Sequence, residues 1–235
     1  PIHDGIQTTD EQIPTQEAEL LAPVLPPTIW AVGLNYQDHA RESGSQPPER
    51  PLLFLKATSA ANGPQTPIAL PAIAPNEVDL EAELAVVIGR KARHVQPEQV
   101  RSYVFGYTCG NDVSARDCQL KLDGQWARGK SFDTFCPLGP WIETELDPDN
   151  LHIASRLNGD TMQDAHTKDM IFPCAELISF ISHCATLYPG TVIMTGTPAG
   201  VGVARDPQVF LRPGDVVEIE IEGIGTLRNP VAKEI

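Results

Sequence analysis

Positive charge is scarce in this chain. Its 235 residues carry 17 lysines and arginines against 31 aspartates and glutamates, which gives a formal net charge of −14. This excess of negative charge would repel phosphate backbones and anionic lipids. The sequence also lacks the Lys/Arg clusters with interleaved aromatic residues that are typical of nucleic-acid sites. We therefore predict no nucleic-acid partner and no membrane partner.

Long apolar runs and paired cysteines are absent as well. No stretch approaches the roughly 18 apolar residues that a bilayer-spanning helix needs. The cysteines are odd in number and form no C-x-x-C pair, which favours reduced thiols and small buried side chains for all five: Cys109, Cys118, Cys136, Cys174 and Cys184. No basic-then-apolar signal segment opens the chain. We expect a cytoplasmic location, or a mitochondrial one if a transit segment has been removed.

The length allows one good-sized core or two small ones. Residues 1–28 are acidic and end in prolines, which predicts an extended lead-in, and residues 29–235 are expected to form one catalytic domain. Many short strands with few helices predict a β-rich α+β fold. Expected strands are Ile29–Leu34, Leu52–Lys56, Asp79–Ile88, Val104–Asn111, Thr191–Thr195, Val216–Glu222 and Gly225–Asn229. Expected helical segments are Asn35–Ser43, Pro97–Val104 and Cys174–Tyr188, and expected loops are 44–51 and 123–141.

One acidic strand differs from the other. In the segment from Asp79 to Ile88, alternation places Asp79, Glu81 and Glu83 on one face, and both faces become apolar after Glu83. The segment Val216–Glu222 alternates throughout, so we interpret it as a solvated edge strand. The first strand should instead run into the core and leave its carboxylates at the mouth of a buried region.

Carboxylates crowded in a partly dry place resist ionisation unless a cation offsets them. Hard divalent cations such as Mg²⁺ or Mn²⁺ prefer oxygen ligands. The pattern therefore suggests a metal site, and by itself leaves a solvated acidic face as the alternative.

Other chemical groups are individually weak signals. His39 and Glu42 would share a helical face, the spacing of a carboxylate-oriented base, although such pairs are commonly solvated. Lys130 lies among hydrophobic neighbours in RGKSFDTF, and Asp112 follows a strand. The turn GTPAGVG offers backbone N–H groups to an anion but lacks the P-loop lysine.

Several of these pieces together resemble the fumarylacetoacetate hydrolase family, from Ile29 to about Val231. The matching stretches are VGLNYQDHARE, PLLFLKATSA, VDLEAELAVVIG, GYTCGNDVSARDCQ, GKSFDTFCPLGPW, TGTPAGVG and LRPGD. The resemblance implies stacked and rolled mixed β-sheets with few helices, a homodimer, and a small anionic 2-oxo or β-diketo acid as substrate.

The resemblance also implies roles for individual residues. The metal ligands would be Glu81, Glu83 and Asp112, holding Mg²⁺ or Mn²⁺, with Ca²⁺ as a further candidate. The catalytic residues would be His39, Glu42 and Lys130. The substrate contacts would be Lys130 and Thr197, to the substrate carboxylate, together with Gly196, Arg116 and Gln119.

The resemblance leaves the reaction open. Such proteins hydrolyse C–C bonds of acylpyruvates, decarboxylate oxaloacetate-like acids, or isomerise and tautomerise 2-oxo acids. Acylpyruvate-cleaving members often have arginine in G-R-N-Y, where this chain has Leu34. The stretches around GKSFDTFCPLGP and VGVARDPQVFLRPGD look closer to mitochondrial-type members, which makes oxaloacetate keto–enol tautomerisation an alternative.

Our hypothesis for the mechanism is a metal-stabilised enolate, with His39 moving the proton, Lys130 holding negative charge and the loop 44–51 closing over the site. A non-catalytic module with a structural divalent cation is the alternative of another class.

Overall fold

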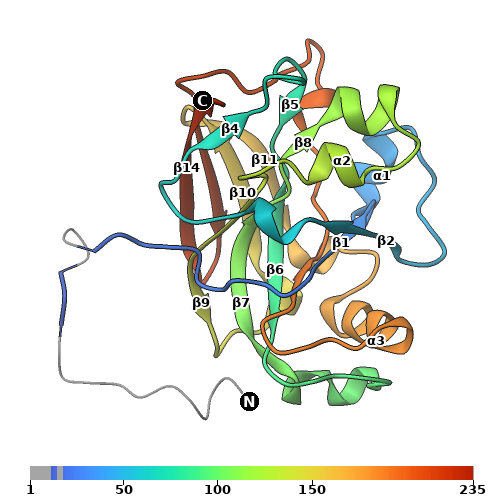
Figure 1. Cartoon of the computed structure of the whole chain (residues 1–235). Coiled ribbons are helices and arrows are strands. Elements are labelled where there is room, and N and C mark those ends of the chain that lie inside the picture. Colours follow the sequence, from blue (N-terminus) through green and yellow to red (C-terminus); the bar gives the residue numbers. More distant parts are fainter. Residues whose placement is uncertain (1–11, 15–17, 235) are drawn as a thin grey trace.

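Two β-sheets dominate the computed structural model, which describes residues 12–14 and 18–234 (Figure 1). The larger sheet has seven strands in the order β2-β1-β12-β6-β7-β9-β3. Its strands are β1 (Ile29–Gly33), β2 (Leu52–Lys56), β3 (Ala61–Asn62), β6 (Ala82–Ile88), β7 (Val104–Asn111), β9 (Cys136–Glu143) and β12 (Val192–Met194). Parallel and antiparallel neighbours both occur, because β1 pairs with β12 in parallel and with β2 antiparallel.

The second sheet has five strands in the order β11-β10-β13-β14-β4. Its strands are β4 (Ile68–Leu70), β10 (His152–Leu157), β11 (Asp160–His166), β13 (Val216–Ile221) and β14 (Gly225–Lys233). A separate two-stranded ladder joins β5 (Val78–Asp79) to β8 (Ser114–Ala115). The strands β10, β13 and β14 contact β6 and β7, so the two sheets pack face to face.

Helices are short and lie to one side of the sheets (Figure 1). The α-helices are α1 (Gln37–Glu42), α2 (Ala127–Lys130) and α3 (Cys174–Cys184). Short 3₁₀ segments are η3 (Thr58–Ala60), η4 (Pro97–Ser102), η6 (Pro148–Asn150), η7 (Thr167–Asp169) and η8 (Gly202–Ala204), and η5 (Cys118–Leu122) is a π-helix. The β-rich α+β prediction is confirmed. No helix of the described part has the length and apolar character required to cross a membrane.

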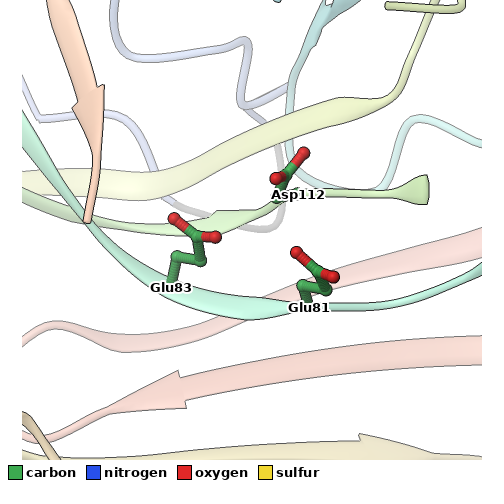
Figure 2. Close-up of side chains that lie close together, drawn as sticks. All are labelled: Glu81, Glu83 and Asp112. Atoms are coloured by element: carbon green, nitrogen blue, oxygen red, sulfur yellow. The ribbon is translucent and has the colours of Figure 1, made fainter. Parts of the chain in front are cut away.

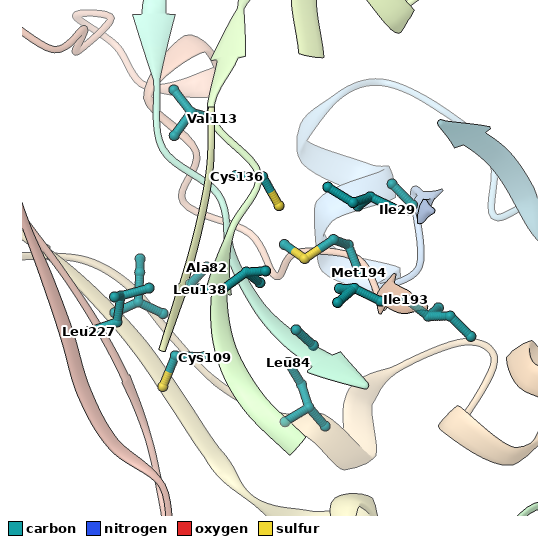
Figure 3. Close-up of a cluster of buried hydrophobic side chains, with 14 of the residues drawn as sticks. Ile29, Ala82, Leu84, Cys109, Val113, Cys136, Leu138, Ile193, Met194 and Leu227 are labelled. Carbon is teal, nitrogen blue, oxygen red and sulfur yellow. The ribbon is translucent and has the colours of Figure 1, made fainter. Parts of the chain in front are cut away.

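The hydrophobic core lies between the sheets and extends along β6 (Figure 3). Every residue of β6 is buried, as expected for a strand covered on both faces. Leu84 of β6 and Leu227 of β14 are both completely buried, and each belongs to the same apolar cluster. The prediction that the acidic strand runs into the core is confirmed.

Replacing Leu84 by alanine is expected to lower the free energy of unfolding by about 2–5 kcal/mol, because the lost side chain leaves a cavity that rigid neighbouring strands cannot fill. Denaturant unfolding measures the change. Leu55 on the edge strand β2 is 46% exposed, so Leu55→Ala is the matched control and should cost under about 1 kcal/mol. Equal losses in the two variants would contradict the packing described for β6.

The expected strand from Asp79 to Ile88 is broken. Asp79 pairs with Ser114 in the small ladder, whereas Ala82 pairs with Asn111 in the large sheet. At the break, the Asp112 N–H donates a hydrogen bond of 2.9 Å to the Glu81 carbonyl oxygen. The two neighbouring segments, 78–88 and 104–115, are therefore interrupted at the same level, and this brings Glu81 beside Asp112.

Three further expectations were wrong in part. Residues 123–141 are not all loop, because α2 and the start of β9 lie there. The first five residues of β9 are buried and include Gly139 and two prolines, so the sequence shows no polar–apolar alternation that would have predicted a strand. The segment Val216–Glu222 is not an edge, since β13 lies between β10 and β14, with Glu220 paired to Arg156. Cys184 is exposed at the end of α3, whereas the other four cysteines are buried.

Candidate metal centre and active site

Three carboxylates meet where the two strands are interrupted. One oxygen from each of Glu81, Glu83 and Asp112 lies within 4.8 Å of the others, and all three residues are buried. Figure 2 shows the side chains of Glu83, on β6, and Glu81, just before β6, rising toward Asp112 on the neighbouring segment that follows β7. Alternation puts the glutamates on the same face of their segment, and the backbone hydrogen bond at the break fixes Asp112 opposite them. The structure thus brings together the three predicted metal ligands.

Buried cations neutralise most of this negative charge. Lys130 Nζ donates to Glu81 Oε2 at 2.8 Å and to Asp112 Oδ2 at 2.7 Å. Lys56 Nζ donates to the other Asp112 oxygen at 2.5 Å. Arg116 bonds Glu81 Oε1 at 2.7 Å, and its Nε bonds Asp79 at 2.5 Å. Charge pairing of this kind is what allows carboxylates to stay ionised when they are buried.

Glu83 is the carboxylate that this pairing leaves out. Within the described chain no ion pair reaches it, and its Oε2 accepts a backbone hydrogen bond from Gly196 at 2.8 Å. Burial raises the pKa of Glu83 well above its usual value, and the negative charges of Asp112 and Glu81 raise this pKa further. Burial also acts to raise the pKa of Glu81, but the cations of Lys130 and Arg116 outweigh it and bring that pKa below its usual value.

The donor set fits a hard divalent cation. Carboxylate oxygens are the ligands that Mg²⁺, Mn²⁺ and Ca²⁺ prefer, and an added cation would offset the charge that Glu83 cannot otherwise carry. Glu81, Glu83 and Asp112 are the residues that would hold it.

A cavity of about 380 Å³ opens over two of these carboxylates, Glu81 and Asp112. Its lining contains most of the predicted catalytic and substrate residues together with apolar side chains: Val32, Gly33, Leu34, His39, Glu42, Ser43, Ser45, Phe54, Glu81, Asp112, Arg116, Gln119, Leu120, Trp126, Lys130, Thr197, Val201, Val203 and Ala204. Ser45 belongs to the segment 44–51, so the predicted closing loop begins at the cavity; its closure stays a prediction. Gly196 lies behind the lining, where it contacts Glu83.

The predicted His–Glu pair is assembled at this cavity. His39 Nδ1 lies 2.7 Å from Glu42 Oε1, and Glu42 Oε2 accepts the Gly200 N–H at 2.9 Å. Helix α1 places the two side chains three residues apart on one face. A carboxylate that accepts the Nδ1 proton leaves Nε2 as the basic nitrogen, so the pair has the arrangement of an oriented general base.

Gln119 presents its amide donors to the cavity. Its Oε1 accepts from Arg116 Nη1 at 2.9 Å, and because a guanidinium only donates, the NH₂ group must face the other way. Lys130 also keeps one of its three N–H donors beyond the two carboxylate bonds. Both side chains can therefore donate to an anionic ligand.

The glycine turn comes close to α1 and its preceding loop. Gly196 has a φ of +98°, and a Cβ there would lie 2.6 Å from the Cβ of Asn35, so only glycine fits without rearrangement. This close approach aims the Gly196 N–H at Glu83.

Two contributors were missed by the sequence reasoning. Lys56 ends the apolar strand β2, and its side chain is fully buried against Asp112. A lysine at the end of an apolar strand was the signal in the sequence that could have suggested a buried charge partner. Gln163 lies on β11, which was not predicted at all, and its amide bonds Ala82 and Thr197. No spacing in the sequence indicates that contact.

The family follows from comparison with known proteins. The fumarylacetoacetate (FAA) hydrolase C-terminal model matches residues 28–232. This chain belongs to the fumarylacetoacetate hydrolase family. It is an enzyme of that family, whose members include hydrolases, isomerases and tautomerases.

Individual relatives within the family differ in the reaction their names record. The mitochondrial oxaloacetate tautomerase Fahd2a of Rattus norvegicus is 47% identical over 93% of this chain and 71% of its own length. A 5-carboxymethyl-2-hydroxymuconate delta-isomerase structure from Mycobacterium smegmatis has a TM-score of 0.87 and 46% identity, covering 97% of this chain and 87% of that one. A fumarylacetoacetate hydrolase from Exiguobacterium antarcticum has a TM-score of 0.85 and 44% identity, covering 91% and 78%. The compartment, cytoplasmic or mitochondrial, stays a prediction.

Proposed function

We propose that this enzyme is a divalent-metal-dependent isomerase that interconverts the keto and enol tautomers of a small 2-oxo acid, with oxaloacetate as the first candidate. The observation that carries the proposal is the combination of a buried three-carboxylate cluster with an oriented His39–Glu42 pair across one cavity. The names of the rat tautomerase and the mycobacterial isomerase support an isomerisation.

Tautomerisation needs only the movement of one proton. A C–H bond next to the 2-oxo group breaks, a C=C bond forms, and the oxygen gains the proton, or the reverse. His39 is suited to take that proton at Nε2, because Glu42 holds Nδ1. A cation held by Glu81, Glu83 and Asp112 would supply Lewis-acid stabilisation of the negative charge that develops on oxygen.

The cavity also provides for an anionic substrate. Gln119 offers its amide NH₂, and Lys130 offers its remaining N–H donor, beside the carboxylate cluster. The same cavity also has apolar lining, where Phe54 and Trp126 pack edge to face at 5.5 Å between ring centroids. Leu34 stands where acylpyruvate-cleaving members often have arginine, so this position gives no cation to a longer substrate. We therefore favour a short acid.

A substrate panel tests the proposal against hydrolysis and decarboxylation. Metal-loaded enzyme is incubated with oxaloacetate, an acylpyruvate and fumarylpyruvate, while enol absorbance and pyruvate are followed. The proposal predicts accelerated keto–enol equilibration of oxaloacetate without pyruvate formation. Rapid pyruvate release from the acylpyruvate would instead support C–C hydrolysis, and release from oxaloacetate would support decarboxylation.

Metal binding is expected to strengthen as the pH rises. The pKa of Glu83 is raised in the folded protein, so below that pKa a proton competes with the cation, by up to about tenfold per pH unit. In the metal-free protein, the raised pKa means that the folded state holds the Glu83 proton more tightly than the unfolded state does. The metal-free protein is therefore expected to lose stability as the pH rises through this pKa. Titration calorimetry with Mg²⁺ or Mn²⁺ in two buffers of different ionisation enthalpy measures the proton released.

The matched control for this titration is Glu220→Gln, which removes a carboxylate from the second acidic strand and should leave metal affinity and proton release unchanged. A wild-type affinity independent of pH, without proton release, would count against Glu83 as a ligand.

We also propose a homodimer, on the resemblance alone. Light scattering of the purified chain tests this proposal, and a monomer at micromolar concentration would refute it.

A further inference from the structure

Gln163 joins the second sheet to the candidate active site. The residue lies on β11 with 1% of its surface exposed. Its Oε1 accepts from the Ala82 N–H and the Ser155 hydroxyl, both at 2.9 Å. Its Nε2 donates to Thr197 Oγ1 at 2.7 Å and to the Pro198 carbonyl at 2.8 Å. Two donors and two acceptor positions of this amide are therefore all in use.

The backbone partners fix which way the amide points. The N–H of Ala82 can only donate, so it must meet the oxygen of Gln163. The carbonyl of Pro198 can only accept, so it must meet the NH₂ group. Thr197 Oγ1 consequently accepts a hydrogen bond from Gln163.

The proton of the Thr197 hydroxyl is committed as well. Oγ1 lies 2.8 Å from the carbonyl oxygen of Ala82, and because a carbonyl only accepts, the hydroxyl donates its one proton there. A hydroxyl has one donor and two acceptor positions. What Thr197 has left for the cavity that it lines is one acceptor position.

We propose that Gln163 is a positioning residue that holds Thr197 Oγ1 as a hydrogen-bond acceptor, so that Thr197 recognises an O–H group of the ligand rather than a carboxylate oxygen. The inference rests on the proposed function, because the enol tautomer of a 2-oxo acid carries an O–H group that the keto tautomer lacks. The role differs from the carboxylate contact expected for Thr197 from the resemblance.

A closed ring of hydrogen bonds fixes the orientation of the Thr197 hydroxyl. Gln163 bonds Thr197, Thr197 bonds the Ala82 carbonyl, and the Ala82 N–H returns to Gln163. Ala82 stands between Glu81 and Glu83, so the same ring fixes the segment that carries two of the carboxylates. Rotation of the hydroxyl toward a carboxylate would leave the Ala82 carbonyl unsatisfied in a buried place, which is costly.

Two small probe ligands test this role in the presence of Mg²⁺. Glycolate carries a carboxylate and an O–H group, whereas oxalate carries two carboxylates and no O–H group. Thr197→Val is expected to weaken glycolate binding about tenfold, the effect of one lost hydrogen bond, and to change oxalate binding by less than about twofold. Damage shared by both complexes cancels in the ratio of the two affinities.

Two more variants complete the measurement. Thr197→Ser keeps the hydroxyl and is expected to restore the wild-type ratio. Gln163→Met has similar length but no amide, so it removes the bonds to Thr197 Oγ1 and to the Ala82 N–H that hold this ring together, and the preference for glycolate is expected to shrink. This variant also supplies the test if Thr197→Val does not fold, as judged by thermal melting.

The outcomes separate the inference from the proposed function. Equal weakening of both ligands by Thr197→Val, or unchanged binding of both, would mean that Thr197 does not distinguish an O–H group from a carboxylate; either result overturns the inference alone. Failure of both ligands to bind the wild-type enzyme would overturn the proposed function and the inference with it.

Discussion

Replacing His39 by alanine is expected to lower kcat for tautomerisation by about 10²–10⁴-fold, the usual contribution of a positioned general base. His39 lines the cavity, and its Nδ1 is held by Glu42, so the variant loses the basic nitrogen without removing a carboxylate of the cluster. Steady-state kinetics measures the loss, and calorimetry should find metal affinity nearly unchanged.

His152 offers a matched control for this variant. Its Nε2 lies 2.8 Å from Asp164, a geometry close to that of the proposed catalytic pair His39–Glu42, but the residue lies on β10 outside the cavity lining. His152→Ala should therefore keep wild-type kcat. Turnover that His39→Ala leaves unchanged would show that His39 is not the base, and metal-dependent melting without any turnover would favour the alternative of a non-catalytic module with a structural cation.

Replacing Glu81 by glutamine is expected to reduce divalent-metal affinity by more than about 100-fold and to abolish turnover, because losing a ligand costs more than the 10–100-fold typical of outer-shell changes. The substitution also removes the negative charge that pairs with Lys130 and Arg116, so two buried cations lose a partner. Calorimetry and the tautomerase assay measure the two effects.

The control for Glu81→Gln is again Glu220→Gln, on a strand with similar alternation of acidic and apolar residues. Metal affinity and turnover should be unchanged there. If Glu81→Gln kept every activity of the substrate panel, the metal site proposed at Glu81, Glu83 and Asp112 would be wrong.

The contrast between the two acidic strands shows how far local patterning reaches. The loss of alternation after Glu83 predicted entry into the core, and β6 is indeed wholly buried. The same reasoning treated Glu218 and Glu220 as an edge, yet β13 is a central strand with one wet face. Alternation reports which faces are buried, and it says nothing about how many neighbours a strand has.

The site depends on contacts that no single segment encodes. The interruption of the strands at Glu81 and Asp112 requires that β5 and β6 pair with different partners. Lys56, which pairs with Asp112 across 56 positions, and Gln163, which pairs with Ala82 across 81, are brought in by the packing of the sheets. By contrast, residue type and spacing were enough to predict the His39–Glu42 pair, because the two residues lie on one turn of the same helix.

Deuterium exchange at the carbon next to the 2-oxo group tests the central claim most directly. Oxaloacetate is incubated in D₂O with metal-loaded enzyme, and NMR follows deuterium at that carbon together with pyruvate. We predict exchange that is much faster with wild-type enzyme than with His39→Ala or metal alone, and that precedes any C–C cleavage. Exchange no faster than with metal alone, or pyruvate release that outpaces it, would contradict the proposed isomerase.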